Sequence, residues 1–270
     1  MSQTIACANQ KGGVGKTTTV VNLATYLGLA GRRVLVLDLD PQGNATSGFG
    51  VDRAALTSTT YEALSEGRPI AELVMPSGSD GVDLVPSAIG LAALEVELAG
   101  ATQRERRLAR AVATVAERYD DVLIDCPPAL GLLTVNALTA ADSVLIPLQC
   151  EYYALEGLGQ LIATIDLVRD HLNPALHICG VLLTMFDART KLSADVAGEV
   201  RRHLRDLVYE TVVPRSVRLA EAPSYGQPIA RYSPESRGAA SYRDLAAEYL
   251  VRAGAPMVVP GHASLVAALA

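Results

Sequence analysis

Residues 9–18 of this 270-residue chain read NQKGGVGKTT, and they are the most informative segment for predicting its fold. It joins residues 3–8, which we expect to form a short buried strand, to residues 16–30, where apolar side chains recur at helical spacing. Gly12, Gly13 and Gly15 permit positive φ angles, so backbone N–H groups can converge on an anion at the helix N-terminus. The pattern K-G-G-x-G-K-T therefore predicts a phosphate-binding loop rather than an ordinary glycine-rich turn.

Lysine is rare in this chain, and its placement is informative. Of the 23 basic residues only three are lysines, and two of these, Lys11 and Lys16, lie within the loop. We expect Lys16 to contact the β- and γ-phosphates of a nucleotide and the Thr17 hydroxyl to ligate Mg²⁺. Lys11 has no room to bind the same nucleotide as Lys16 does. It is best explained as reaching outward, to a nucleotide held by a second subunit.

Two further apolar segments, residues 33–38 and 121–125, are predicted to be strands with acids at their ends. Asp40 follows the first segment and Asp125 closes the second. Acids at the carboxyl ends of parallel strands lie beside the phosphate loop. Each acid alone could simply cap a turn, but the two together favour a role at the phosphate-binding site. Asp125 is then expected to hold the Mg²⁺ shell through water, and Asp40 to begin a loop that rearranges around the γ-phosphate.

The three segments KGGVGKTT, LDLDPQGN and LIDCPP resemble those of the deviant-Walker P-loop ATPases, and most of all the ParA/Soj type of chromosome- and plasmid-partition ATPase. The resemblance extends through residues 181–189, 214–226 and 232–238, so it covers nearly all of residues 1–252. It implies ATP and Mg²⁺ as cofactors, a homodimer in the ATP state, and DNA binding without sequence preference. It also implies a cytoplasmic, nucleoid-associated ATPase whose slow turnover is stimulated by DNA and by a ParB/Spo0J-type centromere-binding protein.

Individual roles follow from the matched motifs. Lys11, Lys16 and Asp40 are the expected catalytic residues, with Asp40 orienting the attacking water by position rather than by strong basicity. Thr17 and Asp125 are the expected metal residues. The expected nucleotide contacts are Lys11, Gly12, Gly13, Val14, Gly15, Lys16, Thr17 and Thr18 in the loop, with Met185, Pro214 and Arg215 near the adenine. No arginine finger is found in these motifs, which predicts slow intrinsic hydrolysis.

Charge is unevenly distributed along the chain. The net charge of −6 argues against a generic DNA-coating protein. However, residues 1–188 carry 12 basic and 21 acidic side chains, whereas residues 189–252 carry 11 basic and 8 acidic ones. Charge alone leaves open a solvated helix face and a DNA surface. The resemblance implies the DNA surface, with Arg189 and Arg218 as candidates. Aromatic residues make up only 4% of the chain, which favours duplex phosphates over stacking on single strands.

Length and composition predict one domain. Apolar strand-like and helix-like segments alternate through residues 142–148, 155–172, 176–185 and 191–206. We therefore expect a single α/β domain of the P-loop NTPase type over residues 1–252, with a mostly parallel twisted sheet and helices on both faces. Residues 67–81 are expected to be a surface connection. Residues 253–270 contain no Asp, Glu, Lys or Arg and are expected to form a flexible C-terminal extension.

The sequence also bears on several functions other than partition. A MinD-like division-site ATPase would bind membrane, but the uncharged tail lacks the Lys and Arg of a membrane-docking helix, so no stable membrane association is expected. A P-loop metabolic enzyme of the dethiobiotin-synthetase kind would leave the basic late segment unexplained. The four cysteines are far apart, which fits buried thiols in a reducing compartment and argues against iron–sulfur relatives. A regulatory role, for example on a replication initiator, stays open.

Overall fold

The computed structural model describes residues 2–151 and 154–254. Within these residues an eight-stranded sheet forms in the order β3-β4-β2-β5-β1-β6-β7-β8, and its neighbouring strands are parallel except for β3 and β4. The strands are β1 (Gln3–Cys7), β2 (Val34–Asp38), β3 (Met75–Pro76), β4 (Val82–Val85), β5 (Asp121–Asp125), β6 (Ser143–Gln149), β7 (His177–Phe186) and β8 (Val208–Pro214). This arrangement confirms the mostly parallel sheet.

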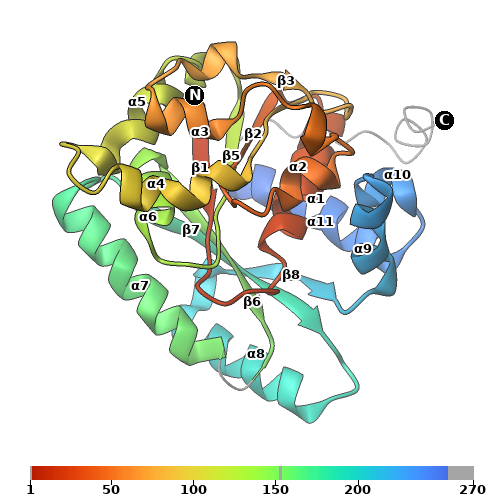
Figure 1. Ribbon diagram of the computed structural model, residues 1–270. Helices are drawn as coiled ribbons and strands as arrows, with labels where there is room; N and C mark the ends of the chain where they lie inside the picture. Colours follow the sequence, from red (N-terminus) through yellow and green to blue (C-terminus); the bar gives the residue numbers. More distant parts are fainter. Residues whose placement is uncertain (1, 152–153, 255–270) are drawn as a thin grey trace.

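Helices cover both faces of the sheet (Figure 1). The first face packs against α1 (Lys16–Leu29), α2 (Asn44–Gly48), α9 (Val217–Glu221), α10 (Ile229–Tyr232) and α11 (Arg237–Arg252). The second face packs against α3 (Thr60–Ser65), α4 (Leu94–Glu97), α5 (Arg107–Ala113), α6 (Leu132–Ala140), α7 (Ala154–His171) and α8 (Lys191–Leu204). Two hydrophobic layers therefore enclose one sheet, as the sequence predicts.

Strand β2 shows how the sequence builds these two layers. Leu35 and Leu37 belong to one apolar cluster, and Val34 and Val36 belong to the other. All four side chains are fully buried. Successive residues of a strand point to opposite faces, so a continuous apolar run is what a strand needs when both faces are covered. The apolar runs at residues 33–38 and 121–125 therefore mark interior strands.

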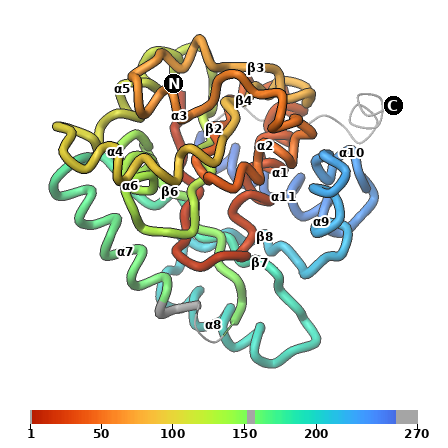
Figure 2. The backbone as a smooth tube through the Cα atoms, viewed as in Figure 1, coloured from red at the N-terminus to blue at the C-terminus, as the bar shows by residue number. Residues whose placement is uncertain are grey.

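The order of the strands brings the predicted motifs together. The chain starts in the middle of the sheet with β1, and α11 near its end packs beside α1 (Figure 2). Strand β5 lies between β1 and β2, and Asp125 pairs in register with both Cys7 and Asp38. The phosphate loop and the two acidic loops therefore leave the same edge of the sheet side by side. This is the edge where open parallel sheets bind ligands.

The bounds of the strands and helices expected from sequence agree with the structure to within one or two residues. One expectation was wrong. Residues 67–81 are not merely a surface connection, because they contain the edge strand β3 and the buried side chains of Ile70 and Leu73. Glycine and proline mark the turns of this segment, but its two buried apolar residues anchor it in the core. Residues 255–270, which make up most of the predicted C-terminal extension, lie outside the described residues.

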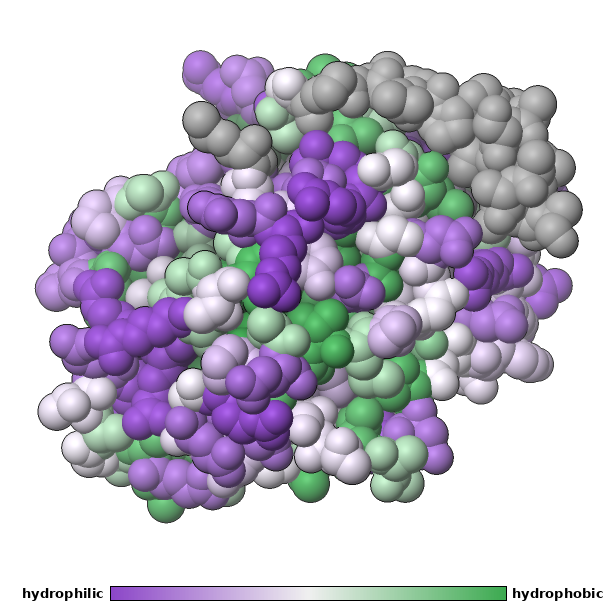
Figure 3. Space-filling view, turned by 90° about the horizontal axis from the view of Figure 1, so that it is seen from above, coloured by the Kyte–Doolittle hydropathy of each residue, from purple (hydrophilic) through white to green (hydrophobic). Residues whose placement is uncertain are grey.

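The surface is mixed in character. In the view of Figure 3, hydrophilic residues occupy much of the face and apolar residues form smaller areas among them. Cys7, Cys126 and Cys150 are buried, Cys179 is partly buried, and all four are free thiols, as expected. No helix within residues 2–151 and 154–254 has both the length and the apolar character needed to cross a membrane.

Candidate nucleotide-binding site

The loop between β1 and α1 has the geometry of an anion site. Gly13 and Gly15 adopt positive φ angles of 73° and 90°, and Gly15 is the N-cap of α1. The first turn of this helix carries no acidic residue. The Thr184 hydroxyl on β7 donates a hydrogen bond of 2.8 Å to the Val14 carbonyl oxygen and fixes the loop against the sheet. Free N–H groups and the helix dipole therefore favour a phosphate at this position.

Gly12 behaves differently from the other two glycines of the loop. All three glycines permit positive φ, but only Gly13 and Gly15 adopt it. A Cβ atom at Gly12 would meet only Pro128 Cβ, at 4.0 Å. Backbone conformation therefore does not require glycine at position 12.

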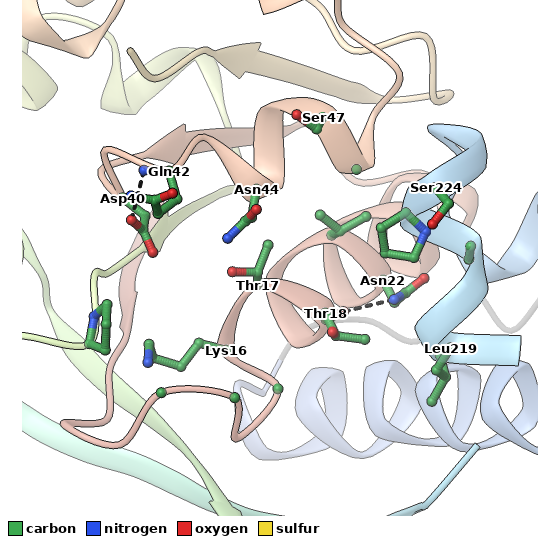
Figure 4. A pocket seen from close by; sticks show the side chains of 18 of the residues that line it. Lys16, Thr17, Thr18, Asn22, Asp40, Gln42, Asn44, Ser47, Leu219 and Ser224 are labelled. Carbon is green, nitrogen blue, oxygen red and sulfur yellow. Dashed lines mark hydrogen bonds between the residues drawn. The ribbon is translucent and has the colours of Figure 1, made fainter. Parts of the chain in front are cut away.

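Lys16 and Thr17 begin the helix with their side chains at the cleft. Lys16 is 6% exposed, and its ammonium donates a hydrogen bond of 3.1 Å to the Lys11 carbonyl oxygen. This contact folds the Lys16 side chain back over the loop. In Figure 4 the Lys16 ammonium and the Thr17 hydroxyl extend toward the side of the cleft on which Asp40 lies. A positive charge and a hydroxyl thus share one end of the cleft.

The cleft above the loop has a volume of about 580 Å³, which is ample for a nucleotide. Among the predicted nucleotide residues, those that line it are Gly12, Gly13, Gly15, Lys16, Thr17, Thr18 and Met185, and Asp40 joins them. Val14 is buried beneath the loop instead. The sequence prediction missed other residues on the walls. They include Asn22 on α1, Gln42 and Asn44 beside Asp40, and the lining residues between Leu219 and Gln227.

Asp125 lies under the cleft as a buried acid. It is fully buried, and neither of its carboxylate oxygens has a hydrogen-bond partner among the described residues. Burial, and next the neighbouring Asp38, raise the pKa of Asp125 well above its ordinary value, while Thr17 and Lys16 act in the opposite direction. A cation bound nearby would offset this shift, because a positive charge stabilises the ionised form of a buried carboxylate.

The donors present suit Mg²⁺. The Thr17 hydroxyl and the Asp125 carboxylate supply oxygen, and Mg²⁺ keeps several of its water ligands when it binds with substrate phosphates. No cluster of three or more His, Cys, Asp or Glu side chains within the described parts of the chain forms a metal cage. The residues therefore fit a magnesium ion held partly by phosphate oxygens and water.

Asp40 and Asp38 occupy different positions although they are two residues apart. Asp40 lines the cleft, is 7% exposed, and accepts a hydrogen bond of 2.9 Å from the backbone N–H of Gln42. Asp38 is fully buried at the end of β2, and burial raises its pKa to about 6. Asp40 is thus the acid that can reach a ligand, whereas the carboxylate of Asp38 is turned into the protein.

A second cavity of about 210 Å³ contains the predicted adenine residues. Met185, Pro214 and Arg215 line it together with Leu219. Met185 and Leu219 also line the larger cleft, so the two cavities share a wall. Met185 has a φ of 49°, a conformation that is uncommon for residues other than glycine and is often found at ligand sites. The predicted adenine residues therefore lie together, next to the phosphate loop.

Lys11 takes no part in lining either cavity. Its ammonium forms an ion pair of 2.6 Å with Glu151, just beyond the end of β6. The Lys11 side chain is 39% exposed and that of Glu151 is 44% exposed. Lys11 is thus held at the surface beside the loop and not over its own nucleotide site, while its backbone carbonyl supports Lys16.

The two predicted DNA residues lie on the surface. The Arg189 side chain is 88% exposed and pairs with Asp187 at 2.8 Å. Arg218 is 59% exposed and pairs with Glu221 at 3.0 Å. Exposed pairs of this kind contribute little stability, so the guanidinium groups can change partners. Both side chains are therefore accessible to a polyanion.

Comparisons with known proteins agree with this geometry. Residues 2–178 match the family model described as an AAA domain. The chain is 55% identical over 248 residues to sporulation initiation inhibitor protein Soj of Bacillus subtilis (strain 168), which covers 92% of this chain and 98% of that protein. It is 54% identical over 248 residues to chromosome partitioning protein ParA of Myxococcus xanthus (strain DK1622). This match covers 92% of the present chain and 88% of that protein.

A solved structure shares the fold. It is described as cobyrinic acid a,c-diamide synthase from Mycobacterium smegmatis with bound ATP analog and magnesium, and it superposes with a TM-score of 0.81 at 39% sequence identity. The match covers 95% of this chain and 98% of that one. The fold around the cleft is therefore shared with a protein that holds an ATP analog and magnesium.

Proposed function

The chain belongs to the Soj/ParA family of chromosome-partitioning ATPases, and from that premise we propose that it is an ATP-switched dimer that moves a chromosome or plasmid origin. In this proposal the dimer binds DNA while it holds ATP, and hydrolysis separates the subunits. A ParB-type centromere-binding protein and DNA stimulate the hydrolysis. The protein then acts in the cytoplasm on the nucleoid.

ATP occupies the larger cleft in this proposal, with its phosphates at the N-terminus of α1. Lys16 neutralises phosphate charge, and its current partner, the Lys11 carbonyl oxygen, is replaced by phosphate oxygens. Thr17 and Asp125 hold Mg²⁺, which supplies charge neutralisation at the β- and γ-phosphates when it is bound. The adenine enters the smaller cavity between Met185 and Pro214.

The position of Lys11 is the observation that carries the dimer proposal. Its ammonium is outside its own cleft and paired with an exposed acid, Glu151. An exposed ion pair is weak, so a triphosphate presented by a second subunit can replace the carboxylate as the partner of Lys11. Two such contacts, related by a two-fold axis, would join the subunits only while ATP is bound.

Hydrolysis is expected to be slow without a partner. Asp40 orients the attacking water, and positioning together with charge stabilisation supplies most of the rate. Among the described residues that line the larger cleft, none is an arginine. Phosphoryl transfer commonly gains a large factor from an arginine that stabilises the transition state. A partner protein that completes the site would therefore accelerate turnover.

DNA binding is proposed to use phosphate contacts. Arg189 precedes α8 and Arg218 lies in α9, and both are exposed. Because such contacts release counterions, a dimer that neutralises about 6 phosphates should lose on the order of 10³-fold in affinity between 50 and 200 mM salt. A much weaker salt dependence would contradict binding through phosphates.

Arg189→Glu tests this surface. The change replaces a phosphate-seeking cation with a repelling anion, so we expect DNA affinity of the ATP form to fall by at least about tenfold at 100 mM salt. ATP-dependent dimers should persist, and both properties can be read from sedimentation with and without plasmid DNA. Arg169→Glu is the matched control, because Arg169 is also an exposed arginine paired with a nearby acid, on α7. Equal DNA affinity of the two variants would remove Arg189 from the interface.

An amide-forming activity is the second candidate, because the structure from Mycobacterium smegmatis is described as a diamide synthase. The higher identity to Soj and ParA, 55% and 54% against 39%, favours partition. The two functions differ in a simple assay. A synthase should need a carboxylate substrate for rapid ATP turnover and should ignore DNA, whereas a partition ATPase should respond to DNA and need no small substrate.

A further inference from the structure

The loop that carries Asp40 is anchored by buried polar side chains that the proposed mechanism does not use. Asp38, Thr46 and Ser87 are each 0% exposed. They belong to three separate segments: the end of β2, helix α2, and the loop that follows β4. Burying polar groups costs free energy unless they are hydrogen-bonded. All three are hydrogen-bonded, and their contacts converge on Asp40.

Asp38 is the acceptor at the centre of this cluster. Its Oδ1 atom accepts from the backbone N–H of Asp40 at 3.2 Å. Its Oδ2 atom accepts from the backbone N–H of Thr46 at 2.8 Å and from the Thr46 hydroxyl at 2.7 Å. One buried carboxylate thus ties the start of the Asp40 loop to the helix that ends it. Only an acceptor with two oxygens can satisfy these three donors.

Thr46 and Ser87 complete a closed ring. The Thr46 oxygen accepts from the backbone N–H of Ser87 at 3.0 Å, and the Ser87 hydroxyl donates to the Asp40 carbonyl oxygen at 2.5 Å. The backbone N–H and the backbone carbonyl of Asp40 are therefore both bound by side chains of the cluster. A short side chain such as Asp can reach few positions from a fixed backbone, so the ring restricts where the Asp40 carboxylate can point.

The cluster lies behind the cleft and not in it. Asp40, Gln42 and Asn44 line the cleft, whereas Asp38, Thr46 and Ser87 do not. In Figure 4 the Asp40 carboxylate is seen with its contact to Gln42, on the same side of the cleft as Asn44. A residue of the cluster therefore cannot touch ATP directly. It can affect the reaction only through the position of Asp40.

We propose that Asp38, Thr46 and Ser87 act as positioning residues that hold Asp40 in line with the attacking water during ATP hydrolysis. This inference rests on the proposed function, in which Asp40 orients that water. Catalytic groups are effective only when neighbouring side chains hold them in place, and small misplacements lower rates steeply. The cluster should thus govern the rate of the chemical step and leave ATP binding alone.

Thr46→Val is the decisive variant, because it keeps the shape of the side chain and removes the hydroxyl that links Asp38 to Ser87. We expect kcat to fall by about tenfold, whereas the dissociation constant for ATP, measured with a fluorescent ATP analog, changes by less than about twofold. Thr46→Ser restores the hydroxyl and should recover kcat to within about threefold of wild type. Ser87→Ala breaks the ring at another point and should also lower kcat, so the test survives if Thr46→Val fails to fold.

Thr139→Val is the matched control. Thr139 is 7% exposed, and its hydroxyl bonds only the Val135 carbonyl oxygen within α6. This variant loses a buried hydroxyl without touching the cluster, so it should keep both kcat and ATP affinity. If kcat is unchanged in folded Thr46→Val and Ser87→Ala, this inference is overturned and the proposed function is not affected. A wild-type protein that never hydrolyses ATP would overturn both the inference and the proposed function.

Discussion

Asp40→Ala should bind ATP as well as the wild type does and hydrolyse it roughly 10²-fold more slowly. The carboxylate lines the cleft at the same end as Lys16 and Thr17, so its loss removes the group that orients water. The phosphate loop and the adenine cavity do not depend on it. The variant should therefore accumulate in the ATP state and remain on DNA. Single-turnover hydrolysis and an ATP-binding assay on the same preparation separate the two effects.

Asp40→Asn refines the same test. Asn keeps the side-chain oxygen that accepts the backbone N–H of Gln42, but it lacks the charge. If charge and position both matter, this variant should also be slow while its loop stays intact. Rapid turnover in both variants would exclude Asp40 as the water-positioning group. The cluster of Asp38, Thr46 and Ser87 would then have no role in catalysis.

Lys16→Ala should lose ATP affinity by roughly 10²-fold or more, because a charged hydrogen bond contributes up to about 3 kcal/mol and each 1.4 kcal/mol is a factor of ten. Lys16 is buried at the phosphate loop, where few other cations can replace it. Isothermal titration with ATP and Mg²⁺ measures the effect. Dimerisation and DNA binding, which both require ATP in this account, should disappear as well.

Lys191→Ala is the control for Lys16→Ala. Lys191 is the third lysine of the chain and is exposed at the start of α8. Removing it deletes the same charge away from the cleft, so ATP affinity should stay at the wild-type value. Comparable losses in the two variants would mean that net charge, and not the phosphate loop, determines nucleotide binding.

The fold and the phosphate end of the site could be predicted because they depend on local patterns. Apolar runs at residues 33–38 and 121–125 fix two interior strands, and the spacing of Gly15, Lys16 and Thr17 fixes a helix N-terminus. A parallel sheet then places Asp125 beside them without further information. These features need only the alternation of strands and the geometry of a short loop.

The rest depends on contacts between distant segments. Glu151 lies 140 positions from Lys11, and no local pattern indicates that the two form an ion pair. Asp38 is buried at the end of β2, whereas Asp40 lies beyond the strand and lines the cleft. This difference follows from the path of the chain after β2, which no local pattern indicates. Ser87 can help to position Asp40 only because the fold brings its hydroxyl to the Asp40 carbonyl oxygen. Leu219 and its neighbours were within a matched segment, yet their place on the cleft wall follows only from the packing of α9.

Sedimentation velocity of Asp40→Ala with ATP, with ADP and without nucleotide shows directly whether ATP joins two subunits. Slow hydrolysis makes this variant the best place to see the ATP state. We expect dimers with ATP and Mg²⁺ and monomers in the other two conditions. Adding Lys11→Ala to this variant should abolish the dimer while ATP still binds. A monomer in saturating ATP, or a dimer that forms equally well without Lys11, would contradict a dimer joined by this lysine.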